Sequence, residues 1–155
     1  LDETRLSGFG VLALFKSVVE FHFSTEDMSL EEAELYIQDV LNRLPDEIID
    51  EIGKLACEWK TDKMASDTAD YPDGLAEANG RDILKFMSVG EVHLYRNPYD
   101  KNDKIIGAIL GGGTEWDFEN GMEIVIQGSK VLEVRELLGY GAFAIWEAND
   151  ERANV

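Results

Sequence analysis

The sequence is poor in cysteine, in proline and in basic residues. Its 155 residues include one cysteine and three prolines, and 14 Lys and Arg stand against 32 Asp and Glu. The single cysteine, Cys57, excludes an internal disulfide and is compatible with a reducing compartment. The formal net charge of −18 opposes binding to phosphate backbones and to anionic lipid. We therefore expect neither a nucleic-acid partner nor a membrane partner.

Long apolar runs are also lacking. The two candidates, residues 9–15 and 105–113, fall far short of the ~20 residues that a membrane helix needs. The chain starts with Leu1-Asp2-Glu3 and so lacks the cationic first part of a secretory signal. These features predict a cytoplasmic protein.

The sequence does contain enough apolar material for a core. Hydrophobic residues make up 45% of the chain and aromatic residues 10%, which argues against disorder despite the charge. The length matches one domain of roughly 100–150 residues. We therefore predict a single domain over residues 1–155.

The first predicted elements are strands within residues 9–23, divided by a turn near Lys16. Phe21 alternates with Glu20 and His22, and a period of two places the phenyl ring inward and the polar pair outward. This pattern predicts one or two strands with a polar face.

Two helices are predicted next. Ser29 and Glu32 have the spacing of a capping box, in which hydroxyl and carboxylate each bond a free backbone N–H at the helix start. Pro45 ends this helix and begins the second. Gly53 lies inside the second helix, where it costs about 1 kcal/mol relative to Ala and so suggests close packing. The short link predicts an antiparallel helical hairpin.

The rest of the chain has the pattern of an antiparallel sheet. Gly128-Ser129 is a two-residue turn between apolar segments, and Gly111-Gly112-Gly113 is interpreted as a flexible turn or bulge. We expect a short helix over 81–87 and strands over 91–96, 104–110, 122–127, 130–134 and 143–147. The predicted fold class is α+β, with N-terminal strands, the helical hairpin and a C-terminal antiparallel sheet.

Acidic residues concentrate on the helical region. Residues 26–82 hold seventeen Asp and Glu against five Lys and Arg. Such a surface attracts basic partners and raises their association rate, although charged helix faces also serve solubility alone. The candidate partner-binding residues here are Glu31, Glu34, Asp39, Asp50 and Glu58.

A second acidic cluster lies at residues 115–123. Read as a strand, it has carboxylates on one face and aromatic rings on the other, with Trp116 beside the acids. The carboxylates suit Mg²⁺ or Ca²⁺, but no second ligand set is identifiable, so we predict no cofactor and assign no metal site. The candidate partner-binding residues here are Glu115, Trp116, Asp117, Glu119 and Glu123.

The histidines and the cysteine give weaker signals. His22 and His93 both fall on the expected polar faces of strands, where a lone histidine is more often a surface residue than a catalytic base. Cys57 lies at the edge of an apolar helical stripe, which favours a partly buried, inert thiol. None of the three is assigned a catalytic role.

The 114–123 segment resembles a motif of a bacterial domain family of unknown function. In that family the pattern is Cys-Asp-Trp-Glu-x-Glu-His-Gly-x-Glu, followed by a hairpin with Gly-Lys-Val-Leu. The positions of this chain that correspond are Thr114, Glu115, Trp116, Asp117, Glu119, Asn120, Gly121 and Glu123, then 129–134. Thr114 replaces the cysteine and Asn120 the histidine, which favours a packing role over a metal-binding or catalytic role.

Some members of that family lie beside polymorphic-toxin genes and are regarded as immunity proteins. The resemblance therefore implies an immunity protein that binds and neutralises a cognate toxin, with a nuclease or another basic toxin domain as the expected partner. Two alternatives remain: a divalent-metal enzyme that uses the 115–123 carboxylates, and an acidic adaptor domain. The sequence leaves open which acidic surface binds.

Overall fold

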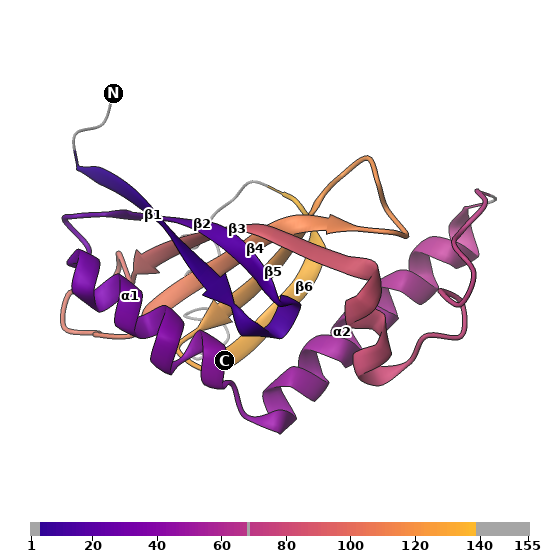
Figure 1. Cartoon of the computed structure of the whole chain (residues 1–155), viewed down its shortest axis with the longest axis horizontal. Coiled ribbons are helices and arrows are strands. Elements are labelled where there is room, and N and C mark those ends of the chain that lie inside the picture. Colours follow the sequence, from indigo (N-terminus) through magenta and orange to yellow (C-terminus); the bar gives the residue numbers. More distant parts are fainter. Residues whose placement is uncertain (1–3, 68, 139–155) are drawn as a thin grey trace.

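The structure is a computed structural model that describes residues 4–67 and 69–138. Six strands and two α-helices form within these residues, together with short 3-10 helices (Figure 1). The elements in chain order are β1 (Arg5–Leu12), η1 (Ala13–Phe15), β2 (Ser17–Ser24), α1 (Leu30–Asp39), η2 (Leu41–Arg43), α2 (Asp46–Ser66), η3 (Gly80–Phe86), β3 (Met87–Arg96), β4 (Ile106–Thr114), β5 (Met122–Gln127) and β6 (Lys130–Glu136).

The strands form one sheet in the order β1-β2-β3-β4-β5-β6. Strands β2 and β3 pair in parallel, and all other neighbours pair antiparallel. A parallel pair needs a crossover, and the segment between β2 and β3 carries both α-helices. The α+β class, the N-terminal strand pair and a mostly antiparallel sheet are therefore confirmed.

The helices depart from the predicted antiparallel hairpin. Helix α1 contacts β1, whereas α2 packs on η3 and β6, and Figure 1 shows the two following one another along the same side of the sheet. The link explains this arrangement, because Leu44 and Pro45 are extended with ψ of 135° and 152° and turn the chain away from α1. Likewise, the N-terminal strands join the C-terminal sheet through β2 instead of standing apart from it.

The core lies between the helices and one face of the sheet. Along β2, the buried Val19, Phe21 and Phe23 alternate with the partly exposed Glu20 and His22. The core face is continued by Val92 and Leu94 in β3, Ala108 and Leu110 in β4, and Met122, Ile124 and Ile126 in β5. The opposite face, which carries Glu20 and His22, is called the open face below.

Two predicted turns are confirmed. Lys16 closes the β1–β2 connection with a φ of 52°, and Gly128 closes the β5–β6 hairpin with a φ of 61°. Both values lie in the left-handed region, which glycine adopts without cost. The side chain of Asn42 holds the first turn, accepting from the N–H of Ala13 at 2.9 Å and donating to the carbonyl of Val11 at 2.9 Å.

The predicted capping box begins α1. The hydroxyl of Ser29 accepts from the N–H of Glu32, and the Glu32 carboxylate accepts from the N–H of Ser29, both at 3.1 Å. The same carboxylate pairs with Arg96 at 2.6 Å. The backbone of Ser29, and then its hydroxyl and Arg96, hold the pKa of Glu32 below its ordinary value. Helix α1 is thereby tied to the end of β3.

Gly53 is packed closely, as its position in the sequence predicts. A Cβ at this residue would lie 2.8 Å from the carbonyl oxygen of Gly80 and 2.9 Å from its carbon. We expect Gly53→Ala to lower the free energy of unfolding by about 1–3 kcal/mol through this overlap, although alanine favours the helix by about 1 kcal/mol. Urea denaturation measures the effect. The exposed Thr61→Ala in the same helix is the control and should be neutral or stabilising; an equally stabilising Gly53→Ala would contradict the packing argument.

Gly111-Gly112-Gly113 lies inside β4, so the first alternative of the sequence analysis, a flexible turn, is wrong, while the second alternative, a bulge, is present where β3 pairs with these residues. Gly112 pairs with Val89, and a Cβ there would overlap the carbonyl oxygen of Ser88. The pairing of β3 with β4 shifts register between Val89 and Glu91, and this bulge brings the two backbones close. The close approach of the two strands therefore requires glycine at position 112, whereas a Cβ at Gly111 or Gly113 would make only ordinary contacts.

Other elements agree or lie outside the described part. The predicted short helix over 81–87 is the 3-10 helix η3, and the predicted strand over 143–147 lies outside the described residues. Within those residues, no helix has both the length and the apolar composition required to cross a membrane.

Candidate functional site

The predicted acidic residues of the helices are all exposed. Glu31, Glu34 and Asp39 lie on the outer side of α1, and Asp50 and Glu58 on that of α2. The core side of α1 is formed by the buried Ala33, Tyr36 and Ile37. The helical period therefore separates the acids from the core, and their charge faces solvent.

One of these residues already has a structural partner. Asp50 pairs with Arg81 of η3 at 2.7 Å, and Arg81 also reaches Asp46 at 3.1 Å. The hydrogen bonds that the Arg81 guanidinium donates to Asp50 and then to Asp46 raise its pKa. Within residues 4–67 and 69–138, by contrast, the carboxylates of Glu58 and Asp62 form no ion pair.

A shallow hollow of about 530 Å³ lies along the acidic side of α2, toward η3. Asp50, Glu58 and Asp62 contribute three carboxylates to its lining, against one ammonium group from Lys54. Cys57 also lines it, partly buried, with its Sγ 3.8 Å from the carbonyl of Ala78. The name α2 hollow is used for this feature, which combines a concave shape with excess negative charge.

Trp116 lies in the core and not at the surface, where a contact residue for a partner would lie. It is 1% exposed and packs edge-on against Trp59 of α2, with ring centroids 5.2 Å apart and planes at 83°. Residues 115–121 form a loop between β4 and β5 and not a strand, so that strand alternation does not apply. The indole is part of the core.

Asp117 is also buried, and it holds this loop together. Thr114 Oγ1 accepts from the N–H of Asp117 at 3.1 Å, and the Asp117 carboxylate accepts from Asn120 Nδ2 at 3.0 and 3.2 Å. Thr114 and Asp117 are 4% and 5% exposed. The motif positions therefore have the packing role that the sequence analysis favoured.

Glu123 is buried as well, and it belongs to the open face. It is 2% exposed, and its carboxylate lies 3.3 Å from Nε of Arg135 on β6. Of the second predicted surface, only Glu119 is fully exposed and Glu115 half-buried. The 115–123 segment thus forms no joint acidic surface.

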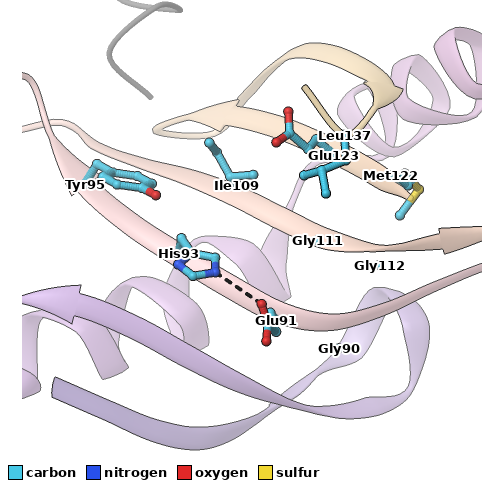
Figure 2. Close-up of a pocket in the computed structure, with 10 residues that line it drawn as sticks. All are labelled: Gly90, Glu91, His93, Tyr95, Ile109, Gly111, Gly112, Met122, Glu123 and Leu137. Carbon is cyan, nitrogen blue, oxygen red and sulfur yellow. Dashed lines mark hydrogen bonds and ion pairs between the residues drawn. The ribbon is translucent and has the colours of Figure 1, made fainter. Parts of the chain in front are cut away.

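The open face carries a group of residues that the sequence analysis did not bring together. A pocket of about 460 Å³ lies there, lined by carboxylates, rings and glycines from β3, β4 and β5 (Figure 2). Figure 2 shows His93 turned toward Glu91, with Tyr95 further along the same strand. Burial is the main cause that raises the pKa of Tyr95. The lining residues are Gly90, Glu91, His93, Tyr95, Ile109, Gly111, Gly112, Met122, Glu123 and Leu137.

His22 stacks on His93 beside this pocket. Their ring centroids are 4.8 Å apart and their planes differ by 15°. Each imidazole has a carboxylate on its own strand: His22 Nε2 lies 3.0 Å from Glu20, and His93 Nε2 lies 3.3 Å from Glu91. The Glu-x-His repeat in both segments was the available signal, but only the strand pairing shows that the two repeats are neighbours.

The comparison with known families decides the classification. A family described as a domain of unknown function (DUF6985) matches residues 7–140, which is most of the chain. The chain belongs to the DUF6985 family. No curated protein and no solved structure matches it.

The DUF6985 match covers all three candidate features. It contains α1, α2 and strands β2 to β6 in full, and therefore the α2 hollow, the 115–123 loop and the open-face pocket. The family description assigns no activity, so a function for this chain must be inferred from the geometry of these features.

Proposed function

We propose that this DUF6985 protein is an immunity protein that binds a basic cognate toxin and blocks it with the acidic side of α2. The proposal is supported by the α2 hollow, a concave surface lined by three carboxylates. Asp50 is already paired with Arg81, whereas Glu58 and Asp62 form no ion pair within the described residues and so supply the free negative charge. A Lys or Arg side chain of the partner fits such a hollow by shape and by charge. Blocking follows if that side chain belongs to the toxin's cationic substrate surface.

The choice between the two predicted surfaces is supported by exposure. The helix acids face solvent. By contrast, Trp116 packs in the core, Asp117 is hydrogen-bonded within its loop and Glu123 forms an ion pair with Arg135. A carboxylate that already has a buried partner contributes little to a new interface. The helical surface is therefore the better candidate for recognition.

Long-range attraction supports fast binding. The net charge of −18 raises the encounter rate with a cationic protein, and salt screens this effect over about 8–10 Å. An immunity protein gains from this, because it must capture its toxin before the toxin acts. The metal-enzyme alternative at residues 115–123 loses support, since Asp117 and Glu123 are engaged by Asn120 and Arg135.

Charge reversal at the α2 hollow tests the proposal. Cells that express the product of the gene immediately upstream receive this chain either unchanged or as Glu58→Lys/Asp62→Lys. We expect the unchanged chain to protect growth and the variant to fail, with an association rate lower by on the order of tenfold at low salt because electrostatic steering is lost.

The control is Glu115→Lys/Glu119→Lys, which changes the net charge by the same amount on the other predicted surface. It should protect growth and bind nearly as fast as the unchanged chain. If both variants lost protection and association rate equally, net charge alone would explain the effect. If only the control lost them, the binding site would lie at the 115–123 loop. Either outcome overturns the assignment of the α2 hollow.

A further inference from the structure

Two Glu-x-His repeats meet on the open face. Glu20-Phe21-His22 lies in β2 and Glu91-Val92-His93 in β3. The parallel register pairs Glu20 with Glu91 and His22 with His93. Because side chains two residues apart share a face, two imidazoles and two carboxylates project side by side from adjacent strands.

The distances within this group are short. One ligand atom from each of His22, Glu91 and His93 lies within 4.8 Å of the others. It is the one such group of His, Cys and carboxylate side chains found in residues 4–67 and 69–138. The two imidazole side chains are 23% and 31% exposed, so the group lies at the surface but is partly sheltered.

The group lacks a cationic partner within the described part of the chain. Glu20 and Glu91 pair there only with the two histidines, and neither Lys nor Arg contacts them. His22 Nε2 is buried and has no hydrogen-bond partner in that part, because its contact with Glu20 at 3.0 Å lacks the geometry of a hydrogen bond. A buried nitrogen lone pair beside two carboxylates is suited to a metal ion.

We propose that His22, Glu91 and His93 bind a divalent transition-metal ion of the zinc class, with Glu20 as a second carboxylate near the site. Imidazole nitrogen and carboxylate oxygen are the ligands that Zn²⁺ accepts, in sites of three protein ligands with one open position. This site lies on the opposite face of the sheet from the α2 hollow, so it is independent of the proposed function.

The backbone already places the ligands correctly. With Zn–N bonds of about 2.0–2.1 Å, tetrahedral ligand atoms are about 3.3 Å apart, so ligand atoms now within 4.8 Å of one another must approach by up to about 1.5 Å. Rotation about χ1 and χ2 provides this movement in partly exposed histidines. The strands themselves need not move, because their pairing fixes the Cα positions.

The pocket of Figure 2 gives the metal a neighbouring space. Glu91 and His93 form part of its lining, and Gly90 and Gly111 leave it open, since a Cβ at Gly90 would meet nothing within 4 Å and one at Gly111 only the Glu91 carbonyl oxygen at 3.9 Å. A three-ligand zinc site keeps a coordination position for water or for a small ligand. The pocket of about 460 Å³ is large enough for either.

Calorimetric titration of the full chain with ZnCl₂, after dialysis against a chelator, tests the proposal. We expect one ion per chain with a Kd of about 10 µM or tighter. His22→Gln and His93→Gln should each weaken binding by about 100-fold, since each removes a direct ligand. CoCl₂ should give the visible absorption of a tetrahedral site in the unchanged chain and not in the variants.

The matched control removes carboxylates elsewhere. Glu115→Gln/Glu119→Gln should leave zinc binding unchanged, whereas under the alternative of a 115–123 metal site it would abolish binding. Weaker binding than stated, or binding that persists after both histidine substitutions, overturns the proposal.

Proton NMR of the unchanged chain provides a test that requires no substituted protein, so it does not matter whether the variants fold. The chain has two histidines in total, so every imidazole resonance belongs to this site. Addition of ZnCl₂ should shift or broaden the ring resonances of both. Resonances that stay in place while zinc binds would assign the metal to other residues and contradict the inference.

Discussion

Replacing Trp116 with alanine is expected to lower the free energy of unfolding by about 3–5 kcal/mol, the range for truncation of a buried aromatic side chain. Trp116 is 1% exposed and makes an edge-on contact with Trp59 at 5.2 Å between ring centroids. Alanine would leave a cavity where the 115–121 loop joins α2 to the sheet. The total free energy of unfolding of a native protein is small, so this loss alone can unfold much of the population.

Urea denaturation measures this effect, with two control variants. Trp116→Phe should cost less, because the indole Nε1 has no hydrogen-bond partner within the described residues and the ring remains apolar. Phe118→Ala removes a neighbouring ring that is 76% exposed and should change stability by less than about 0.5 kcal/mol. A small loss of stability for Trp116→Ala, combined with loss of partner binding, would restore the interpretation of Trp116 as a contact residue.

Lys60→Met is expected to lower the free energy of unfolding by about 2–4 kcal/mol, since buried acceptors lose a charged donor. Lys60 is 4% exposed, and its Nζ donates to the carbonyls of Leu75, Ala76 and Ala78 at 3.1, 3.3 and 2.6 Å. The ammonium group thereby fixes the 75–78 turn against α2. Methionine fills a similar volume but leaves these carbonyls without their donor.

Hydrogen exchange and urea denaturation together test the role of Lys60. In Lys60→Met we expect the amides of residues 75–82 to exchange faster, since the turn and η3 lose their attachment to α2. Lys54→Met, an exposed substitution in the same helix, removes the same charge and should alter stability by less than about 0.5 kcal/mol. Equal effects at both positions would contradict the buried-cation account.

Local signals in the sequence predicted the local structure well. The capping box at Ser29, the helix start after Pro45 and the turn at Gly128 all depend on neighbouring residues, and the structure has each of them. The packing inferred at Gly53 has the same origin, since a helix tolerates glycine poorly unless space demands it. These features need no knowledge of distant partners.

The pairing of strands that are distant in the sequence could not be predicted from such local signals. The parallel pairing of β2 with β3 joins segments separated by the whole helical crossover, and no local pattern specifies it. This is why His22 and His93 were treated as two unrelated surface residues. For a similar reason the sequence does not distinguish a turn from a bulge at Gly111-Gly112-Gly113, because the approach of the β3 backbone at Ser88 and Val89 is what requires Gly112.

The candidate site was predicted in part. Helical periodicity identified the exposed acids of α1 and α2, because one face of each helix had to be apolar. The strand alternation predicted for residues 115–121 is wrong, because this segment is a loop. Hydrogen bonds among Thr114, Asp117 and Asn120 hold the loop, and the indole of Trp116 is buried in the core. Thr114 and Asn120 both hydrogen-bond to Asp117 within this loop, which is consistent with the packing role expected for them.

Native mass spectrometry shows whether the acidic side of α2 binds a basic toxin. The chain is co-expressed with the product of the gene immediately upstream, purified and weighed. The account predicts a 1:1 complex with a basic protein for the unchanged chain and for Glu115→Lys/Glu119→Lys, and a free monomer for Glu58→Lys/Asp62→Lys. A monomer in all three samples, or a complex that survives reversal at Glu58 and Asp62, would contradict it.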